Sequence, residues 1–288
     1  MSGYTQPPVY ALSLSWVGAS GLEPDDDLIL RVGKGLTYFL QSRLKDGLTY
    51  VFHPWETGCD DSPRFDSWVG SSSYDFPEWT RSDLLLNERT SFAKEGDAIS
   101  NDSFVCSPSL FNAILSYGLL LVSELTGDAQ MRTASYEIGE SMDDLLWNDQ
   151  EGMYVDRPLV GGGPSCQIPT LDGVLSALGS VSRKRAVACL DQLRDPARFA
   201  ARFGLRYLPP DHPTYQPGEY WRGAAWPQLA FLAVRACERW SLDKLAQEIA
   251  EKGRASIRTA GWSEFWNPES GEGRGAKPQT WAALAAAL

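Results

Sequence analysis

Acidic residues are the groups in this chain best placed to perform acid-base chemistry. The segment 53–66 (HPWETGCDDSPRFD) brings Glu56, Asp60 and Asp61 into one stretch, and Glu264 lies in a second acidic segment near the end of the chain. Hydrolysis of a glycosidic bond needs one carboxylic acid to protonate the leaving oxygen and one carboxylate to activate water or attack the sugar. The residues alone leave Glu56, Asp60 and Asp61 as rivals for the acid.

The residues that other kinds of catalysis would need are scarce in this chain. A serine- or cysteine-based triad would have to use His53 or His212, which lie beside prolines and suit structural hydrogen bonds better. The 5 cysteines are scattered and form no C-x-x-C pair, which argues against a disulfide framework or a zinc site. No H-E-x-x-H, Walker or dinucleotide-binding motif occurs. We therefore expect neither a metal nor a cofactor.

Aromatic residues accompany the acids. The chain has 11 Trp, 11 Tyr and 11 Phe, and tryptophans gather near acids and glycines in residues 220–226 (YWRGAAW) and 262–274 (WSEFWNPESGEGR). A flat apolar face with a polar edge suits the face of a sugar ring. Any one of these tryptophans could equally fill the core between helices.

Three of these segments follow one another in an order typical of a known family. Residues 53–66, 220–227 and 264–273 resemble, in turn, the H-P-W-E-S-G-x-D-N-S-P-R-W-D, Y-W-R-G-P-x-W and E-Y-Y-N-P-x-T-G-x-G segments of glycoside hydrolase family 63. Residues 5–8 match a T-Q-P-P that opens an inner helix near the pocket in that family. In a further similar segment, F-x-V-x-D-P-x-x-N, Ser107 replaces the acid.

The resemblance implies a function and a set of site residues. It implies an inverting α-glycosidase acting on a small α-glucosyl or α-mannosyl compound such as glucosylglycerate or mannosylglycerate, with Asp60 as general acid and Glu264 as general base. A trehalase is disfavoured by the prolines at 54 and 63. Arg64 is also expected to order its loop through charge-assisted hydrogen bonds. The residues expected to bind the substrate are Gln6, Trp55, Glu56, Arg64, Tyr220, Trp221, Arg222, Gly223 and Trp226.

A series of helices must position these segments. Apolar stretches that begin near residues 5, 107, 168, 222 and 277 alternate with amphipathic ones, and the pattern recurs with a period of about 55 residues. Buried helices that alternate with covering helices indicate a toroid of helical hairpins. We predict an all-α fold, an (α/α)₆ toroid, in a single catalytic domain over residues 1–288. The aperiodic stretch 45–106 is expected to be a long functional loop.

The toroid is expected to be incomplete. The resembling family has six inner and six outer helices, whereas we count five apolar and four amphipathic segments here. About three helices are then missing at the amino-terminal side, which should uncover the apolar flanks of the first and last inner helices. We expect either that a second copy of the chain covers that edge, forming a homo-oligomer, or that the chain is poorly stable alone. The alternative function is a catalytically impaired, truncated barrel that acts as a sugar-binding or structural relic.

Composition limits the partners. The 26 basic and 37 acidic residues give a net charge of −11, which argues against nucleic acid or an anionic membrane as partner. We find no leader peptide and no apolar run of the roughly 18 residues that a membrane span needs. The expected partner is a small carbohydrate substrate, and the expected location is the cytoplasm.

Overall fold

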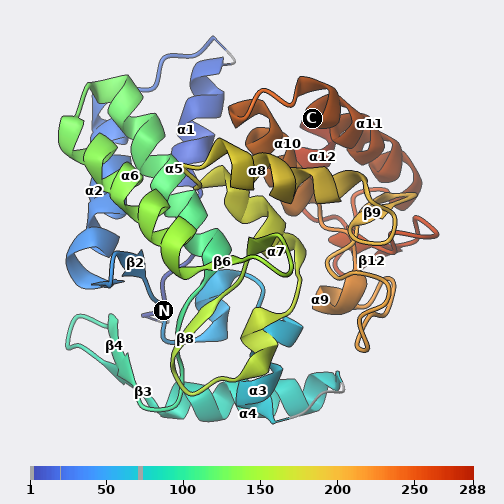
Figure 1. The fold of residues 1–288 in the computed structure, drawn as a ribbon, viewed down its shortest axis with the longest axis horizontal. Coiled ribbons are helices and arrows are strands. Elements are labelled where there is room, and N and C mark those ends of the chain that lie inside the picture. The colour runs from blue at the N-terminus through green and yellow to red at the C-terminus, as the bar shows by residue number, and fades with distance from the viewer. Residues whose placement is uncertain (1–2, 20, 71–73) are drawn as a thin grey trace.

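The computed structural model describes residues 3–19, 21–70 and 74–288. In these parts of the chain, helical hairpins are arranged around a common centre (Figure 1). The inner helices are α1 (Tyr10–Ala19), α5 (Ser109–Thr126), α7 (Leu171–Leu175), α10 (Pro227–Arg239) and α12 (Ala282–Ala287). The outer helices are α2 (Asp26–Ser42), α6 (Ala129–Leu145), α8 (Arg183–Asp191) and α11 (Asp243–Ala260).

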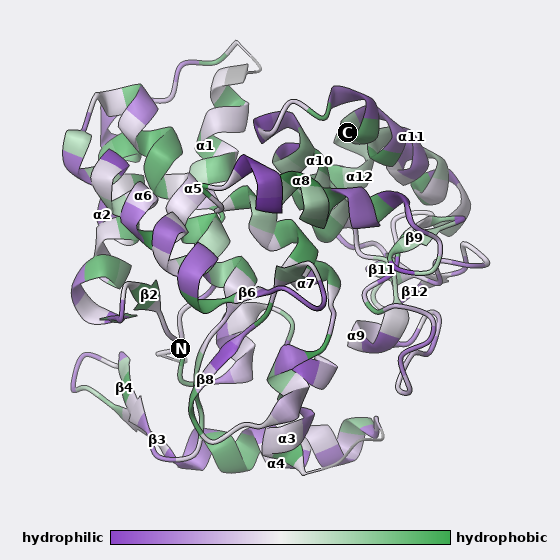
Figure 2. Cartoon of the chain, in the orientation of Figure 1, coloured by the Kyte–Doolittle hydropathy of each residue, from purple (hydrophilic) through white to green (hydrophobic). Residues whose placement is uncertain are grey.

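The inner helices contact one another in chain order. Helix α1 packs on α5, α5 on α7, α7 on α10, and α10 on α12, while α6 covers α5 and α11 covers α10. Figure 2 shows hydrophilic residues concentrated on α6, α8 and α11 and hydrophobic ones on α5 and α7. The predicted all-α toroid, with buried and covering helices in alternation, is therefore confirmed.

Capping residues explain where the hairpins begin and turn. The side chain of Asp25 accepts a hydrogen bond from the backbone N–H of Leu28 at the start of α2, and Asp128 caps α6 in the same way. Between α5 and α6, Gly127 adopts a left-handed conformation with φ of 75°, which a glycine adopts without a steric penalty. These residues set the tight reversal from an inner to an outer helix.

Helix α5 differs from the expectation about apolar runs. By length and composition alone, the window Ser109–Thr126 is long and apolar enough to cross a membrane. However, 72% of that window is buried inside the protein, as in the core helix of a folded domain. The prediction that no run reaches this length was wrong, although most residues of α5 are buried.

Further helices and short strands lie in the connections between the inner and outer helices. The other helices described are α3 (Asp66–Val69), α4 (Phe76–Glu88) and α9 (Tyr220–Gly223). The strands described form two-stranded antiparallel ribbons: β1 (Leu44–Lys45) with β2 (Leu48–Thr49), β3 (Thr90–Phe92) with β4 (Ala98–Asn101), β5 (Val105–Ser107) with β8 (Arg157–Val160), β6 (Trp147–Asn148) with β7 (Met153–Tyr154), β9 (Ala200–Ala201) with β10 (Gly204–Leu205), and β11 (Phe265–Trp266) with β12 (Gly273–Arg274). The stretch 45–106 is thus not a structureless loop, because it contains α4 and the β3–β4 ribbon.

The first and last inner helices flank an apolar cavity of about 230 Å³. Leu12 and Trp16 of α1, Leu232 of α10 and Leu284 of α12 are among its lining residues, and residues 57–59 lie against it as well. Trp16 also contacts the ring of Phe231 in α10, with 5.0 Å between ring centroids. In the described chain, α1 therefore approaches α10 through this pair of rings, and the cavity lies beside the contact.

Candidate active site

The buried carboxylate of Glu56 fixes the loop that carries Asp60. Glu56 lies in the 3₁₀ turn Pro54–Thr57, and its side chain is fully shielded from solvent. It accepts hydrogen bonds from the backbone N–H and hydroxyl of Thr5 and from the N–H of Phe52, and it forms an ion pair of 3.3 Å with Arg43. All of these donors hold Glu56 in place. This placement removes it from the rivals for the general acid and from the surface available to a substrate.

Arg64 joins the same loop to two other parts of the ring. Its guanidinium lies 2.7 Å from Asp156 and 2.6 Å from Asp172 of α7, and all three side chains are buried. Charge-assisted hydrogen bonds of this kind order the segments that they connect. The geometry therefore supports the predicted ordering role of Arg64, and it leaves this side chain no exposed surface on which to bind a sugar.

Asp60 and Glu264 lie far apart in the sequence but close enough in the fold for their charges to interact. Burial, together with the smaller effects of the negative charges of Asp61 and Glu264, raises the pKa of Asp60 to about 6, against a backbone hydrogen bond that lowers it. Glu264 is half-buried, and its Oε2 accepts a hydrogen bond of 2.8 Å from the N–H of Ala276. The structure thus brings the predicted pair together.

Asp61, the remaining candidate for the general acid, is held by a hydrogen bond from Tyr74. The hydroxyl of Tyr74 donates a hydrogen bond of 2.8 Å to its Oδ2. Burial raises the pKa of Asp61, whereas this hydrogen bond and the charge of Arg222 lower it. Asp61 is 5% exposed, so it has less access to a substrate than Asp60 has.

The segment 220–226 builds an aromatic wall beside these acids. Burial raises the pKa of Tyr220, and the charges of Asp60, Asp61 and Glu264 raise it further, which places this phenol among the three carboxyl groups. The rings of Trp221 and Trp226 are stacked, with centroids 3.9 Å apart and planes 10° apart. Both tryptophans are 2% exposed, so they support the site from behind more than they offer a free stacking face.

Arg222 and Gly223 are placed by packing. The guanidinium of Arg222 forms two hydrogen bonds, of 3.0 and 2.8 Å, with the carboxylate of Asp66, and it is fully buried. A Cβ added to Gly223 would lie 2.6 Å from the carbonyl oxygen of Gln216, so the chain approaches too closely here for any side chain. The two terminal nitrogens of Arg222 are thus engaged by Asp66, while its buried Nε has no hydrogen-bond partner among the described residues.

Gln6 and Trp55 are joined by a hydrogen bond. The side-chain amide of Gln6 donates a hydrogen bond of 2.8 Å to the carbonyl of Trp55. Trp55 is half-buried, and its indole N–H donates to Oδ2 of Asp83 at 2.9 Å. These two predicted residues are therefore held as one unit with part of their surface in solvent.

The sequence reasoning missed three residues of the site, namely Tyr74, Asp83 and Trp281. Asp83 lies on α4, and burial raises its pKa to about 7 with the help of the charges of Asp61 and Asp60, against the hydrogen bond from Trp55. Trp281 donates its indole N–H to the carbonyl of Glu264 at 2.9 Å. The closeness of tryptophan 281 to an inner-helix start was a signal, but nothing in residues 74–88 marked the other two as site residues.

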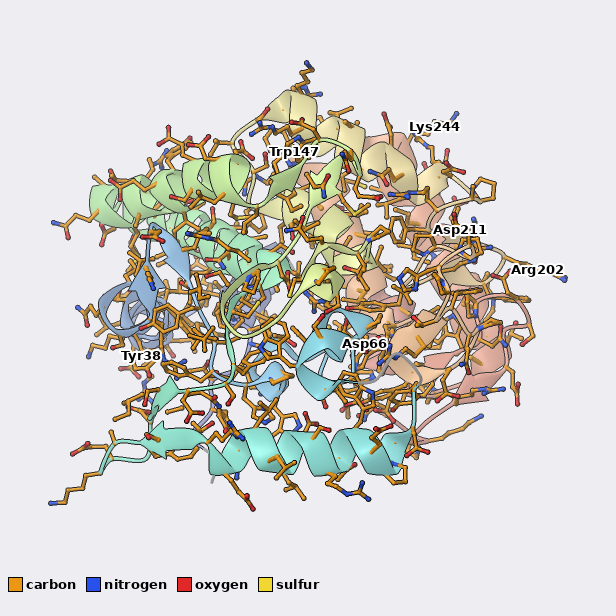
Figure 3. The ribbon with its side chains drawn as sticks, turned by 60° about the horizontal axis from the view of Figure 1, so that its bottom comes forward. Tyr38, Asp66, Trp147, Arg202, Asp211 and Lys244 are labelled. Atoms are coloured by element: carbon orange, nitrogen blue, oxygen red, sulfur yellow. The ribbon has the colours of Figure 1, made fainter. Side chains whose placement is uncertain are left out.

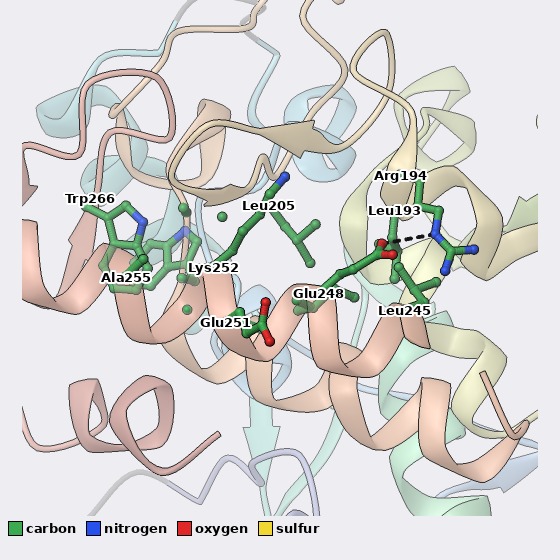
Figure 4. Close-up of a pocket in the computed structure, with 15 residues that line it drawn as sticks. Leu193, Arg194, Leu205, Leu245, Glu248, Glu251, Lys252, Ala255 and Trp266 are labelled. Carbon is green, nitrogen blue, oxygen red and sulfur yellow. Dashed lines mark hydrogen bonds and ion pairs between the residues drawn. The ribbon is translucent and has the colours of Figure 1, made fainter. Parts of the chain in front are cut away.

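No arrangement of three or more His, Cys, Asp or Glu side chains fit to hold a metal ion occurs in the described parts of the chain. A separate cavity of about 640 Å³ lies along α11, away from the paired acids (Figure 4). Its polar residues include Arg194 and Glu248, which form an ion pair with each other at 3.2 Å. Trp226 also lines this cavity, whereas Asp60 and Glu264 are not among its lining residues.

Comparison with known proteins places this geometry in a family. Residues 1–282 match the model of the mannosylglycerate hydrolase MGH1-like glycoside hydrolase domain. The chain is 25% identical over 324 residues to the mannosylglycerate hydrolase of Thermus thermophilus, and this match covers 99% of this chain and 76% of that protein. It is 24% identical over 342 residues to the glucosylglycerate hydrolase of Mycolicibacterium hassiacum, covering 99% and 74% of the two chains.

A solved structure shares the fold. The crystal structure of the GH63 mannosylglycerate hydrolase from Thermus thermophilus in complex with glucose superimposes with a TM-score of 0.81 at 24% identity, and the match covers 99% of this chain and 75% of that one. The resemblance to glycoside hydrolase family 63 found in the sequence is thereby confirmed. The chain belongs to the mannosylglycerate hydrolase MGH1-like glycoside hydrolases of family 63.

Proposed function

We propose that this glycoside hydrolase cleaves the α-glycosidic bond of a small glycosyl compound with inversion of configuration, and that glucosylglycerate or mannosylglycerate is its substrate. Asp60 donates a proton to the leaving oxygen, and Glu264 activates the attacking water. The relatives named mannosylglycerate and glucosylglycerate hydrolases, each matched over nearly the whole of this chain, support the choice of substrate.

The observation that carries the proposal is that Asp60 and Glu264, far apart in the sequence, lie close enough for the charge of Glu264 to act on Asp60. A pKa of about 6 lets Asp60 hold a proton close to neutral pH, and the charge of Glu264 contributes to that value. A general acid must be protonated when the substrate arrives, and a general base must not be. Glycoside hydrolysis uses two carboxyl groups close to each other, one for each of these roles.

The remaining polar and aromatic groups suit a sugar. The phenol of Tyr220 lies among the acids, and the unit formed by Gln6 and Trp55 has part of its surface in solvent. Hydroxyl groups of a sugar can accept from and donate to such groups, while a half-buried indole packs against the ring. The side chains thus supply both kinds of contact that a monosaccharide needs.

The test is hydrolysis of a panel of α-glucosides and α-mannosides, with the anomer of the released sugar followed by NMR. We expect the β-anomer first, and we expect Asp60→Asn and Glu264→Gln each to lower kcat by about 10²–10⁴-fold or more, because each removes a proton-transfer group. Glu272→Gln is a matched control, since Glu272 is exposed and lies in the same ribbon region as Glu264. It should retain full activity.

Each part of the proposal can fail separately. Initial release of the α-anomer would contradict inversion. Near-full activity of Asp60→Asn or Glu264→Gln would contradict the assignment of that residue. Binding of sugars without turnover of any member of the panel would favour the alternative, a sugar-binding protein without catalytic activity.

A further inference from the structure

The backbone of Glu264 is held on both sides by residues that follow it in the chain. Its N–H donates a hydrogen bond of 2.9 Å to the carbonyl of Ala276, and its carbonyl accepts one of 2.9 Å from the indole N–H of Trp281. In Figure 3 this carboxy-terminal part of the chain lies on the side of the ring where Arg202 and Asp211 are labelled. The backbone that carries the proposed general base is therefore fixed at both of its polar groups.

Ala276 also holds the carboxylate of Glu264. Its N–H donates the hydrogen bond of 2.8 Å to Oε2, while its carbonyl accepts from the backbone of the same glutamate, so the two residues close a hydrogen-bonded ring. None of the described residues donates a hydrogen bond to Oε1, and Glu264 is half-buried. The two carboxylate oxygens therefore differ, because Oε2 is fixed and Oε1 can accept a hydrogen bond from a water molecule.

Gly275 packs directly against this carboxylate. A Cβ added to Gly275 would overlap Oε2 of Glu264 and would lie 2.6 Å from Cβ of Glu264 and 2.8 Å from Cε1 of Phe265. Its φ of 73° is in the left-handed region, which a glycine adopts without a steric penalty. The ring of Phe265 is 8% exposed and has little room to move. A side chain at position 275 would therefore push the carboxylate away or lift the loop off it.

We propose that Gly275 and Ala276 are positioning residues that orient the general base, and that Oε1 of Glu264 is the oxygen that takes a proton from the attacking water. This inference rests on the proposed role of Glu264. The oxygen of water bonds to the anomeric carbon, and the bond from that carbon to the leaving oxygen breaks. The proton of Asp60 moves to the leaving oxygen, and one proton of the water moves to Oε1. A carboxylate fixed through Oε2 keeps Oε1 aimed in one direction, which proton transfer in this geometry requires.

Hydrogen exchange tests the contact without any turnover. Ala276 is exposed, so protection of its amide depends on the hydrogen bond to Oε2. We expect NMR to show a protected amide in wild-type protein, with exchange faster by about threefold or more in Glu264→Ala and in Gly275→Ala. Glu272→Gln, in the same ribbon region, should leave the rate unchanged. Equal exchange rates in wild type and Gly275→Ala would overturn the proposal.

Steady-state kinetics test the effect on the base. Gly275→Ala removes no hydrogen-bonding group but displaces the carboxylate, so kcat should fall by about 10²-fold while KM changes by less than about threefold. Gly127→Ala is the matched control, because Gly127 has φ of 75° and a Cβ there would meet nothing within 4 Å. It carries the same backbone strain at the α5–α6 reversal and should keep the wild-type kcat. A wild-type kcat in Gly275→Ala would refute the positioning role.

The choice of leaving group separates a displaced base from a displaced acid. An α-glycosyl fluoride of the same sugar needs little help from a general acid, because fluoride departs readily, but its hydrolysis still needs a base to activate water. Asp60→Asn should therefore lose much less activity on the fluoride than on the best glycoside of the panel, whereas Gly275→Ala should lose about the same on both. A loss in Gly275→Ala that shrinks on the fluoride would contradict an action through Glu264.

These measurements separate the inference from the proposed function. If wild-type protein hydrolyses no glycoside, the proposed function fails, while hydrogen exchange still decides whether Ala276 holds Glu264. If wild-type protein is active and Gly275→Ala matches it, the proposed function stands and the positioning role is refuted. Should Gly275→Ala fail to fold, Ala276→lactic acid, introduced by nonsense suppression, removes the N–H donor without adding a side chain. We expect it to lower kcat by about tenfold, and an unchanged kcat would overturn the proposal.

Discussion

At the residue scale, the acids of this site differ in what surrounds them, although their side chains are chemically alike. Glu56 is surrounded by donors and holds the loop, whereas Asp60 is buried beside other acids and keeps its proton to a higher pH. Environment, and not residue type, therefore assigns the roles. The raised pKa of Asp60 has consequences for both activity and stability.

The consequence for activity is a fall at alkaline pH. Because the general acid works only when protonated, kcat/KM should fall as the pH rises through the apparent pKa to which Asp60 contributes, about 6 for Asp60 itself. A pH profile of kcat/KM for the best substrate of the panel provides the measurement. Activity that instead increases steadily from pH 6 to about pH 9 would show that Asp60 does not act as the acid.

The raised pKa also means that ionisation of Asp60 lowers the stability of the folded protein. The pKa of Asp60 in the folded protein, about 6, lies above its ordinary value of 3.8, so ionisation opposes folding. That penalty is absent below 3.8, grows between the two values and is complete above about 6. Asp60→Asn should therefore raise Tm relative to wild type at pH 7, and the gain should vanish near pH 3.5. Equal Tm values at both pH values would contradict the burial of Asp60 in solution.

The sequence could identify the loop that holds the acid but could not choose among its acids without the family resemblance. The three acids differ in their neighbours in the fold: Glu56 has Thr5, Asp60 has Glu264, and Asp61 has Tyr74. These neighbours lie far away in the sequence or beyond a turn. Burial of Arg222 against Asp66 was equally invisible, because it depends on two segments that meet only in the folded chain.

At the element scale, helix α4 shows why one part of the site was missed. Its buried residues, Trp79, Asp83 and Leu86, have the spacing of a helical stripe, but an aspartate stands at the centre of that stripe. A search for apolar periodicity therefore finds no helix between residues 76 and 88. The inner helices α5 and α7, in contrast, were predictable from their apolar composition, because most of their residues are buried.

The connection made by Arg64 between its turn and α7 gives an element-scale prediction. Arg64→Met leaves Asp156 and Asp172 buried without their cation, so the free energy of unfolding should fall by about 3–5 kcal/mol. Arg31→Gln breaks an exposed ion pair with Asp27 and should change it by less than about 1 kcal/mol. Urea unfolding of both variants makes the comparison, and similar losses would contradict a stabilising role of the buried network.

At the scale of the whole molecule, the order of the hairpins was predictable from the sequence. The packing of the first helix, α1, near the last hairpin was not. Alternating segments predict neighbours along the chain, such as α1 with α5 and α10 with α12. The approach of Trp16 to Phe231 and the cavity beside it depend on total curvature, which no single segment encodes. Coverage of this flank by a second copy of the chain stays a prediction.

The gathering of carboxyl groups in the pocket has a consequence for how fast a substrate arrives. With a net charge of −11 and acids at the site, the protein repels an approaching anion, and dissolved ions weaken that repulsion. Raising ionic strength from roughly 10 mM to roughly 200 mM should therefore increase kcat/KM for an anionic glycosylglycerate. A neutral glycoside of the same sugar should respond far less. Equal responses would mean that long-range repulsion does not limit capture, and that the carboxylate of the aglycone meets a locally positive path into the pocket.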